Sequence, residues 1–334
     1  MINVLSLFDG MAGARVALDR LGIECNYYAS EVDKYAIKIA KKNYPDIKHL
    51  GCIKDIKAKD LPPIDLILGG SPCQDLSVAK SNRKGLKGEK SSLFYEYVRL
   101  LRECNPKYFI LENVASMGKE SRNIITKLLG VSPIKISSAL VTAQNRKRYY
   151  WTNFLVFPPI DRGILLKDII LDGQVDKDKA YCVTATYRLD GLKTYLNKKK
   201  RQIVFADKSY CLPATDYKEN VKSLIKRNKK GLIVKETGIY TVPRGFNKGG
   251  LRITDKAPAV TSNAFEHNNK LVINPKYTEE GIRKLHPIEC ERLQGFSDNY
   301  TEGVSNTQRY KMIGNSFTVP VIEHILSFIK EELK

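Results

Sequence analysis

The sequence lacks the features that mark several large classes of protein. No apolar run reaches 18 residues, so no membrane-spanning helix is indicated. The N-terminus carries no basic stretch followed by an apolar core, so we expect no secretory signal. The seven cysteines form no CxxC pair, and their odd number and wide spacing argue against a disulfide framework or a zinc site. We therefore expect a soluble protein of a reducing compartment, without a bound metal.

Acidic residues are scarce relative to basic ones. The 334-residue chain has 56 Lys and Arg against 36 Asp and Glu, a formal net charge of +20. This balance favours a polyanionic partner, with nucleic acid ahead of an anionic membrane. The excess is densest between residues 158 and 275, where 23 basic residues accompany 12 acidic ones. A lysine-rich solvated surface would give the same counts, so charge alone does not identify the partner.

The first 157 residues alternate short apolar runs with amphipathic segments. Apolar runs that favour strands lie at 4–8, 27–30, 66–68, 108–111, 136–141 and 150–157, and helices are expected at 14–21, 33–43, 92–104 and 121–129. This alternation predicts an α/β domain with a doubly wound, mostly parallel sheet. From Pro158 to residue 275 the pattern gives way to Lys-, Gly- and Tyr-rich segments with short strand-like pieces. The helical period then returns, which predicts a small β-rich domain, 158–275, inserted into an α/β domain of residues 1–157 plus 276–334.

One stretch places the thiol of Cys73 shortly after the end of a predicted strand. Leu66 to Leu68 form a buried strand, and two glycines and Pro72 then turn the chain just before Cys73. Open α/β sheets bind ligands at the carboxyl ends of their strands. Cys73 is therefore a candidate nucleophile, although a small apolar cysteine in a turn is the simpler reading of this stretch taken alone.

Polar and glycine residues also follow the first three predicted strands. A glycine-containing turn, Phe8-Asp-Gly-Met-Ala-Gly13, opens a helix, Glu31 ends the second strand, and Asp55 follows the third. Acidic side chains in such positions suit ribose hydroxyls and an adenine amino group. The turn is not a GxGxxG, which disfavours a dinucleotide. A nucleoside cofactor without phosphates, such as S-adenosylmethionine, suits these residues best.

Seven short motifs occur in order along the chain, and together they resemble those of the cytosine-C5 DNA methyltransferases. They cover nearly the whole chain outside residues 158–275. The segment Leu5-Ser-Leu-Phe-Asp-Gly10 resembles the one found in the eukaryotic de novo branch of the family and in its phage and bacterial relatives. The motifs are Phe8-Asp-Gly10, Glu31, Gly70-Ser-Pro-Cys-Gln74, Glu112-Asn-Val114, Gln144-Asn-Arg-Lys-Arg148, Glu291-Arg-Leu-Gln-Gly295 and Gly314-Asn-Ser316.

The resemblance assigns the chemistry to three residues. Cys73 matches the nucleophile, whose thiolate adds to C6 of cytosine and makes C5 reactive enough to accept a methyl group. Glu112 would bind the N3 edge of the base, protonated or sharing a proton. Arg146 would bind the cytosine O2, with Arg148 supporting the same cluster. Because C5 is inaccessible in a stacked duplex, the target cytosine must be flipped out of the DNA.

The same resemblance implies S-adenosylmethionine as cofactor and double-stranded DNA as substrate. Residues 1–157 plus 276–334 would form the catalytic domain, with an S-adenosylmethionine-dependent methyltransferase fold, and 158–275 a target-recognition domain. Positions that match cofactor contacts are Phe8, Gly10, Glu31, Asp55, Ile56, Leu93, Asn315 and Ser316. Expected DNA contacts are Gln74, Ser77 and Arg83 in the segment after Cys73, Arg148, and Arg244, a candidate for reading guanine in the major groove.

Two other functions stay open from the sequence. One branch of the family acts on tRNA with the same catalytic set, although the long basic insert favours DNA. A DNA-binding module without catalysis is the second alternative, and the intact Cys73, Glu112 and Arg146 argue against it.

We expect a cytoplasmic monomer, nucleoid-associated in a bacterial or phage-infected cell, with no membrane partner. A cognate restriction endonuclease is a further candidate partner.

Overall fold

The structure is a computed structural model that describes most of the chain. Contacts between residues divide the chain into two compact units. Unit 1 comprises residues 1–170, 177–187 and 286–334, and unit 2 comprises 171–176 and 188–285. The described residues are 1–72, 93–173, 175, 177–183, 185, 202–205, 238–241, 250–253, 269–272 and 282–334.

Unit 1 begins with alternating strands and helices. In chain order these elements are β1 (Ile2–Leu7), α1 (Gly13–Arg20), β2 (Cys25–Ser30), α2 (Lys34–Asn43), β3 (Lys48–Gly51), the 3-10 turns η1 (Ile53–Asp55) and η2 (Ala58–Asp60), β4 (Leu66–Gly70), α3 (Leu93–Cys104), β5 (Tyr108–Val114), α4 (Lys119–Leu129) and β6 (Ile134–Ser137). There follow η4 (Ser138–Leu140), β7 (Gln144–Asn145), β8 (Lys147–Thr152), η5 (Leu166–Asp168) and β9 (Ala180–Tyr181). The chain ends with α8 (Pro287–Gln294), α9 (Asn306–Asn315), α10 (Val319–Ser327) and α11 (Lys330–Leu333).

A seven-stranded sheet organises unit 1, in the order β3-β2-β1-β4-β5-β8-β6. The first five of these strands are parallel neighbours, and β8 is antiparallel to both β5 and β6. The predicted mostly parallel α/β fold is therefore confirmed. The chain order reverses between β1 and β4, so the carboxyl ends of these two strands flank the position where such sheets bind ligands.

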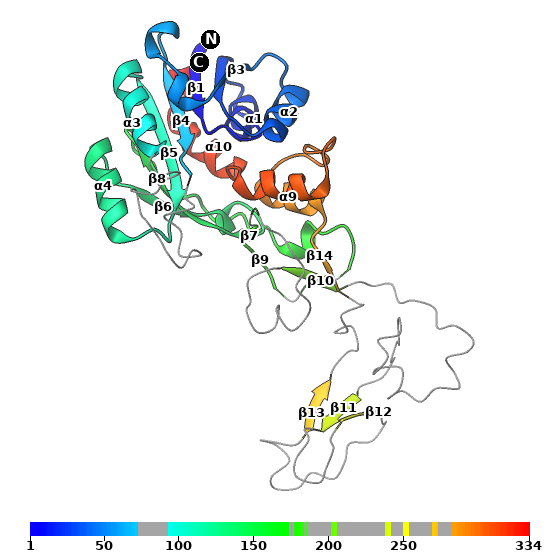
Figure 1. Cartoon of the computed structure of the whole chain (residues 1–334). Coiled ribbons are helices and arrows are strands. Elements are labelled where there is room, and N and C mark those ends of the chain that lie inside the picture. The colour runs from blue at the N-terminus through cyan, green and yellow to red at the C-terminus, as the bar shows by residue number, and fades with distance from the viewer. Residues whose placement is uncertain are drawn as a thin grey trace. The chain divides into compact units, whose positions relative to one another are not determined.

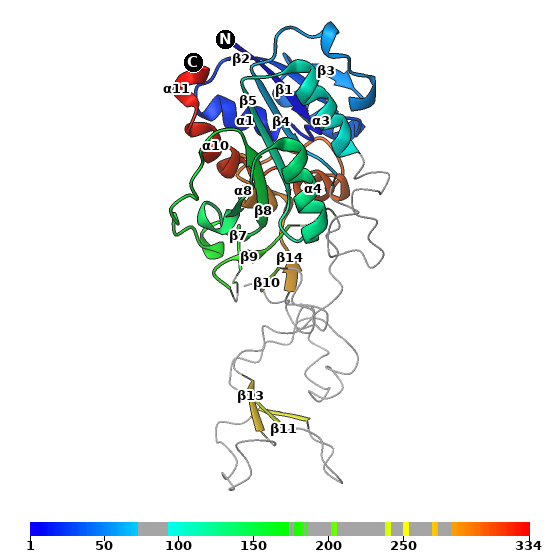
Figure 2. The same cartoon turned by 90° about the vertical axis from the view of Figure 1, so that its left-hand side faces the viewer.

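Helices cover both faces of this sheet. Both views show α3 and α4 on the side opposite α1 and α10 (Figures 1 and 2), and α1 packs directly against α10. Large apolar side chains from the central strands and from α3 form one buried cluster, including Trp151, Phe94, Tyr97, Ile67 and Leu111. Burial on both faces explains why β4 and β5 read as continuous apolar runs.

Local sequence signals account for several element boundaries. The Asp33 side chain accepts a hydrogen bond from the Tyr35 backbone N–H at 2.9 Å and caps α2 as expected. Gly22 follows α1 with φ of 67°, the left-handed conformation that glycine adopts readily after a helix. Two predicted strands were wrong in part. Residues 136–141 leave the sheet after Ser137 and continue as η4, and the strand expected at 150–157 ends at Thr152.

Unit 2 contains short antiparallel pairings among its described residues. Strand β10 (Ile203–Phe205) pairs with β14 (Ile282–Lys284). Strand β11 (Gly238–Thr241) pairs with β12 (Gly250–Ile253) and with β13 (Asn269–Val272). The predicted domain limits and the target-recognition role of the insert stay predictions. None of the helices that the structure describes combines the length and apolarity needed to cross a membrane.

Candidate active site

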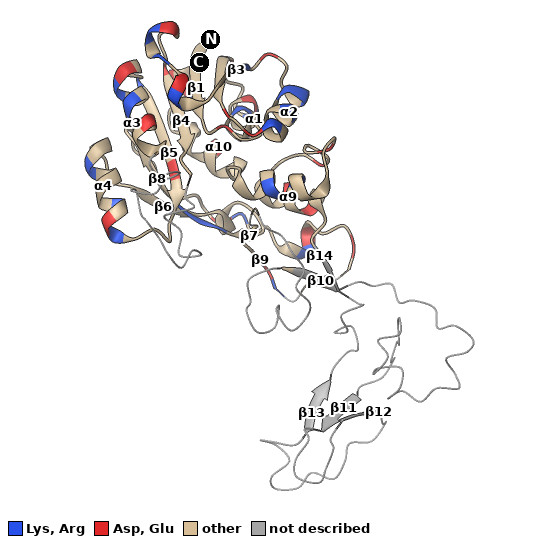
Figure 3. Ribbon diagram, viewed as in Figure 1, with Lys and Arg blue, Asp and Glu red and all other residues tan. Residues whose placement is uncertain are grey.

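Glu112 and Arg148 meet at the carboxyl end of the central strands. Glu112 lies near the end of β5, opposite Gly70 in the register with β4. Arg148 lies on the antiparallel neighbour β8, where it is opposite Val114 and diagonal to Glu112 on the same face. Arg148 Nε lies 2.8 Å from Glu112 Oε1, and both side chains are largely buried. Figure 3 shows the basic residues at the start of β8 beside this end of the sheet.

Arg146 occupies a different environment from Arg148. Its Nη1 donates to the carbonyl of Gly314 at 3.1 Å and to that of Val183 at 3.4 Å, and its Nη2 donates to the carbonyl of Ser316 at 3.0 Å. Arg146 is 4% exposed. Its Nε has no hydrogen-bond partner within the described part of the chain. The guanidinium therefore clamps the Gly-Asn-Ser motif, and the structure brings Arg148, not Arg146, to Glu112.

Hydrogen bonds fix the chain at Ser71, two residues before Cys73. Asn113 Nδ2 donates to the carbonyl oxygen of Ser71 at 3.2 Å and to its Oγ at 3.0 Å. Ser71 is buried. These bonds tie the exit of β4 to the end of β5, next to Glu112. The predicted site residues Cys73, Gln74, Ser77, Arg83 and Arg244 lie outside the described residues.

The turn after β1 carries the predicted cofactor contacts Phe8 and Gly10. Phe8, Gly10 and Ala12 all have positive φ, of 59°, 62° and 66°. The Gly10 N–H donates to Glu31 Oε2 at 2.8 Å, while Glu31 Oε1 accepts from the backbone N–H groups of residues 32 and 33. A carboxylate offers about four acceptor positions, so three bonds leave Glu31 able to accept from a ligand hydroxyl. Phe8 is half-buried beside this turn.

The remaining cofactor candidates lie on three segments of unit 1. Asp55 is exposed at the end of η1, Ile56 is buried directly after it, and Leu93 is half-buried at the start of α3. Asn315 is exposed at the end of α9. Ser316 Oγ is buried without a partner in the described part of the chain, and it lies 3.0 Å from the point where a Cβ on Gly13 would be. An orphaned hydroxyl beside the glycine turn fits residues that bind a polar nucleoside cofactor.

Asp9, in the same turn, is a further candidate that its sequence position does not mark. Its Oδ1 accepts hydrogen bonds from Ser6 Oγ and from the Tyr27 hydroxyl, both at 2.6 Å. Its Oδ2 is buried without a partner among the described residues. Burial is the main cause that raises the pKa of Asp9 to about 6, and the Glu31 charge adds to it. An acidic residue in a glycine turn reads as solvated, so only the contacts reveal its burial.

A buried amide network joins two of the sequence motifs to each other and to residues on either side of a third, Gly314-Asn-Ser316. Gln294 Nε2 donates to the carbonyl of Ile313 at 2.9 Å, and its Oε1 accepts from Thr318 Oγ1 at 2.7 Å and from Gln144 Nε2 at 3.2 Å. Gln144 Oε1 in turn accepts from the Val183 N–H at 2.9 Å. Every one of these bonds is buried, which fixes the segment from α9 to α10 against β7.

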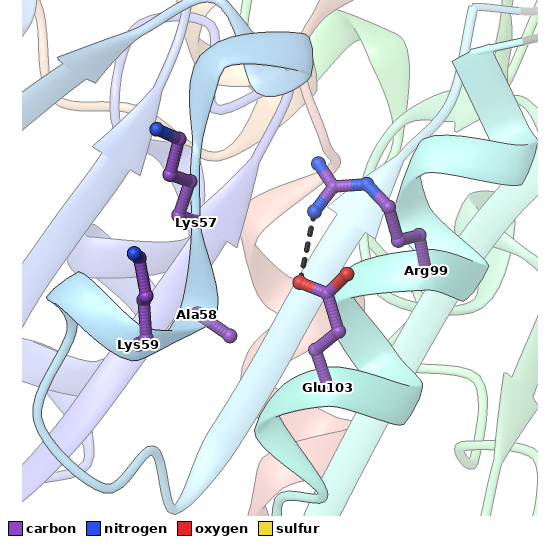
Figure 4. Close-up of a pocket in the computed structure, with 5 residues that line it drawn as sticks. All are labelled: Lys57, Ala58, Lys59, Arg99 and Glu103. Carbon is purple, nitrogen blue, oxygen red and sulfur yellow. Dashed lines mark hydrogen bonds and ion pairs between the residues drawn. The ribbon is translucent and has the colours of Figure 1, made fainter.

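A separate hollow of about 540 Å³ opens between η2 and α3 (Figure 4). Its lining residues are Lys57, Ala58, Lys59, Arg99 and Glu103. The two lysine side chains lie one above the other and point the same way in this view, and Arg99 forms ion pairs with Glu103 and Glu96 at 2.9 and 2.8 Å. None of the predicted site residues lines it, so the catalytic assignment rests on the strand ends and not on this hollow.

Comparison with known proteins identifies the family of this chain. The profile of the family described as C-5 cytosine-specific DNA methylase matches residues 2–331. The chain belongs to the C-5 cytosine-specific DNA methylase family. It is 28% identical to the type II methyltransferase M1.ScrFI of Lactococcus lactis subsp. cremoris, over 99% of this chain and 79% of the relative. It is 27% identical to the orphan methyltransferase M.SPRI of Bacillus phage SPR, over 97% of this chain and 96% of the relative.

The solved structures agree on the fold of this family member. The Entamoeba histolytica methyltransferase EhMeth superposes with a TM-score of 0.64 at 17% identity, covering 100% of this chain and 99% of that one. The predicted methyltransferase fold is thereby confirmed. The family match and the curated relatives show that the chain is a DNA cytosine-C5 methyltransferase. Membership of the family implies S-adenosylmethionine and DNA binding in general terms.

Proposed function

We propose that the protein transfers a methyl group from S-adenosylmethionine to C5 of a flipped-out cytosine in duplex DNA, through a covalent bond between Cys73 and C6. The observation that carries this proposal is the Glu112–Arg148 pair, 2.8 Å apart, beside the exit of β4 that leads to Cys73. A carboxyl group and a guanidinium are complementary to the N3 edge and the O2 of a single cytosine. A thiol that follows two residues after Ser71 would be close to the same base.

The chemistry needs covalent activation because C5 of cytosine is a weak nucleophile. The Cys73 thiolate adds to C6, and the electron pair of the C5–C6 double bond then becomes available at C5. Bound S-adenosylmethionine supplies the methyl group as an electrophile. C5 would form the new carbon–carbon bond as the bond between the methyl carbon and the sulfonium sulfur breaks, with S-adenosylhomocysteine as the leaving group. A base would then remove the C5 proton, and the C6–sulfur bond would break to return the thiolate. Glu112, hydrogen-bonded to N3, limits the build-up of negative charge on the ring while the adduct exists.

We assign the contact with cytosine O2 to Arg148 and a structural role to Arg146. Arg148 Nε is bound to Glu112, and its Nη1 donates to the carbonyl of Lys147 at 3.0 Å, so the guanidinium is held beside the carboxylate. Arg146 donates three hydrogen bonds to main-chain carbonyls at distances of 3.0–3.4 Å. We therefore assign the contact with the base to Arg148, two residues after Arg146, to which the sequence motif assigns it.

We propose that the glycine turn and the ends of β2 and η1 bind S-adenosylmethionine. Glu31, with acceptor capacity left over, would accept from the ribose hydroxyls, and Asp55 from the adenine amino group. Phe8, Ile56 and Leu93 would supply apolar contacts. Gly10, Asn315 and Ser316 would bind the methionine part. The orphaned Ser316 hydroxyl supports this assignment.

The DNA contacts and partners are proposed from sequence position. Gln74, Ser77 and Arg83 would lie near the opened base pair, and Arg244 in the insert would read a guanine. A cognate restriction endonuclease is a candidate partner because M1.ScrFI is named a type II methyltransferase, while M.SPRI is named an orphan enzyme. We expect the protein to act as a monomer.

Release of tritium from DNA containing [5-³H]cytosine tests the proposal. The wild-type protein is expected to release tritium in the presence of S-adenosylmethionine, and Cys73→Ala to release none while still binding DNA. Cys104→Ala is the matched control, because this thiol lies at the end of α3, away from Glu112. Tritium release by Cys73→Ala at the wild-type rate would overturn the covalent mechanism. A parallel assay on total tRNA tests the choice of nucleic acid.

A further inference from the structure

The last two residues of β4 are glycines that face aromatic rings on opposite sides of the sheet. A Cβ added to Gly69 would lie 2.8 Å from Cε2 of Tyr97, which belongs to α3. A Cβ added to Gly70 would lie 3.0 Å from Cε1 of Phe317, at the junction between α9 and α10. Real Cβ contacts are seldom this close, so each glycine admits a ring that any other residue would displace.

The space over Gly70 is shared between the Phe317 ring and the Glu112 carboxylate. The same added Cβ would lie 3.2 Å from Glu112 Oε2. The edge of the Phe317 ring and this carboxylate oxygen therefore both lie beside Gly70, 3.0 and 3.2 Å from the position that its Cβ would occupy. The other carboxylate oxygen of Glu112 is bound to Arg148 at 2.8 Å. Phe317 and Glu112 are both buried. The carboxylate is thus confined between a guanidinium and a glycine that is covered by an aromatic ring.

Hydrogen bonds on either side prevent Phe317 from moving away. The carbonyl of Ser316 accepts from Arg146 Nη2 at 3.0 Å, and Thr318 Oγ1 donates to Gln294 Oε1 at 2.7 Å. Both bonds are buried, and the partners Arg146 and Gln294 are themselves buried. Because the residues before and after it are fixed, Phe317 presents its ring to Gly70 as a rigid surface.

We propose that Phe317 is a positioning residue for methyl transfer: through Gly70 it sets the separation between the exit of β4 and the Glu112 carboxylate. The chain reaches Cys73 three residues after Gly70, so a shift of Gly70 changes how thiol and carboxyl group meet the same cytosine. The ring also keeps water from one side of Glu112. This inference rests on the proposed role of Glu112, which Glu112→Gln tests separately through loss of methyl transfer.

The experiment combines Phe317→Leu with Gly70→Ala. Leucine lacks the ring edge that covers Gly70, and alanine brings a methyl group into the place of that edge. Misplacement of reacting groups by about 1 Å can cost on the order of 100-fold in rate, so each single variant is expected to lower kcat about tenfold or more. In the double variant the methyl group enters the vacated space. If the two substitutions acted independently, their reductions of kcat would multiply. The kcat of the double variant is expected to be about tenfold higher than that multiplication gives.

Two further readouts separate positioning from cofactor binding and from general stability. The Kd for S-adenosylmethionine, measured by calorimetry, is expected to stay within about threefold of wild type. Leucine keeps the Phe317 Cβ, which lies 3.6 Å from the place of a Cβ on Gly13 in the glycine turn, and changes only the ring that covers Gly70. Phe328→Leu is the matched control, because Phe328 is a partly exposed aromatic at the end of α10. Phe317→Met serves as a second variant if leucine unfolds the protein.

Two outcomes would overturn the inference. Strictly multiplicative effects of Phe317→Leu and Gly70→Ala on kcat would show that the two residues act independently. An unchanged kcat with a raised Kd for S-adenosylmethionine would assign Phe317 to the cofactor pocket instead. Neither outcome affects the proposed function, which fails only if Cys73→Ala or Glu112→Gln keeps full activity.

Discussion

Arg148 Nε lies 2.8 Å from Glu112 Oε1, whereas Arg146, two residues earlier, directs its guanidinium at the carbonyls of Gly314 and Ser316. The two arginines of one short motif therefore have different partners. Arg148 belongs to the end of the sheet where the base would bind, and Arg146 to the packing between that sheet and the C-terminal helices.

Substitution of each arginine alone should affect a different property: Arg148 the rate of methyl transfer, and Arg146 the free energy of unfolding. Arg148→Gln is expected to lower kcat by about 100-fold, since it removes a charged donor from the base. Arg146→Gln is expected to lower the free energy of unfolding by about 3 kcal/mol or more, because it leaves buried carbonyls without donors. Urea unfolding and single-turnover methyl transfer measure the two effects. If Arg146→Gln proved fully stable but inactive, the assignment of roles would be reversed.

Gly69 should tolerate no side chain. An added Cβ would lie 2.8 and 2.9 Å from two Tyr97 ring carbons and 3.2 Å from the carbonyl of Leu7. The ring cannot move freely, because the Tyr97 hydroxyl donates to the carbonyl of Ile110 at 3.1 Å. Gly69→Ala is therefore expected to destabilise the protein by about 1–3 kcal/mol in thermal or urea unfolding.

Gly118→Ala is the control for that experiment. Nothing lies within 4 Å of a Cβ at Gly118, and its φ of −64° suits any residue. Its unfolding free energy is expected to change by less than about 1 kcal/mol. Equal effects of the two substitutions would mean that Tyr97 does not constrain the end of β4.

Asp9 should make stability depend on pH below neutrality. Burial raises the pKa of its carboxyl from 3.8 to about 6, so the folded state retains a proton that the unfolded state loses across this window. The unfolding free energy contributed by Asp9 is therefore largest below pH 3.8 and is lost as pH rises through 6. A shift of about two pKa units corresponds to about 3 kcal/mol.

Asp9→Asn isolates this contribution, because asparagine keeps an acceptor for Ser6 and Tyr27 but does not ionise. The stability of the variant relative to wild type is expected to improve by up to about 3 kcal/mol between pH 4 and pH 8. Urea unfolding across that range measures the difference. Curves that run parallel for the two proteins would show that Asp9 titrates alike in the folded and unfolded states.

The sequence predicted the fold where local signals and burial agree. Helix α3 was expected at 92–104 and lies at Leu93–Cys104, and the cap at Asp33 is present. In these places apolar periodicity and capping chemistry specify the same structure. The antiparallel insertion of β8 between β5 and β6 was not predicted, because strand direction depends on pairing with distant residues.

The candidate site was predictable only in part, for a physical reason. Arg146 and Arg148 are two residues apart, a spacing that places side chains on one face of a continuous strand. Arg146, however, lies between β7 and β8 and belongs to neither, so the alternation is interrupted. The burial of Asp9 likewise depends on Ser6 and Tyr27, which come from two neighbouring strands. Tertiary contacts of this kind leave no periodic signal in the sequence.

The most direct test of the account is to trap the bond between Cys73 and cytosine. DNA in which 5-fluorocytosine replaces the target cytosine lacks the C5 proton that must leave, so the adduct should persist after methyl transfer. With S-adenosylmethionine present, mass spectrometry of the digested complex is expected to find the methylated base attached to the peptide that contains Cys73, and no adduct in Cys73→Ala. Attachment through another residue, or methyl transfer without any adduct, would contradict the account.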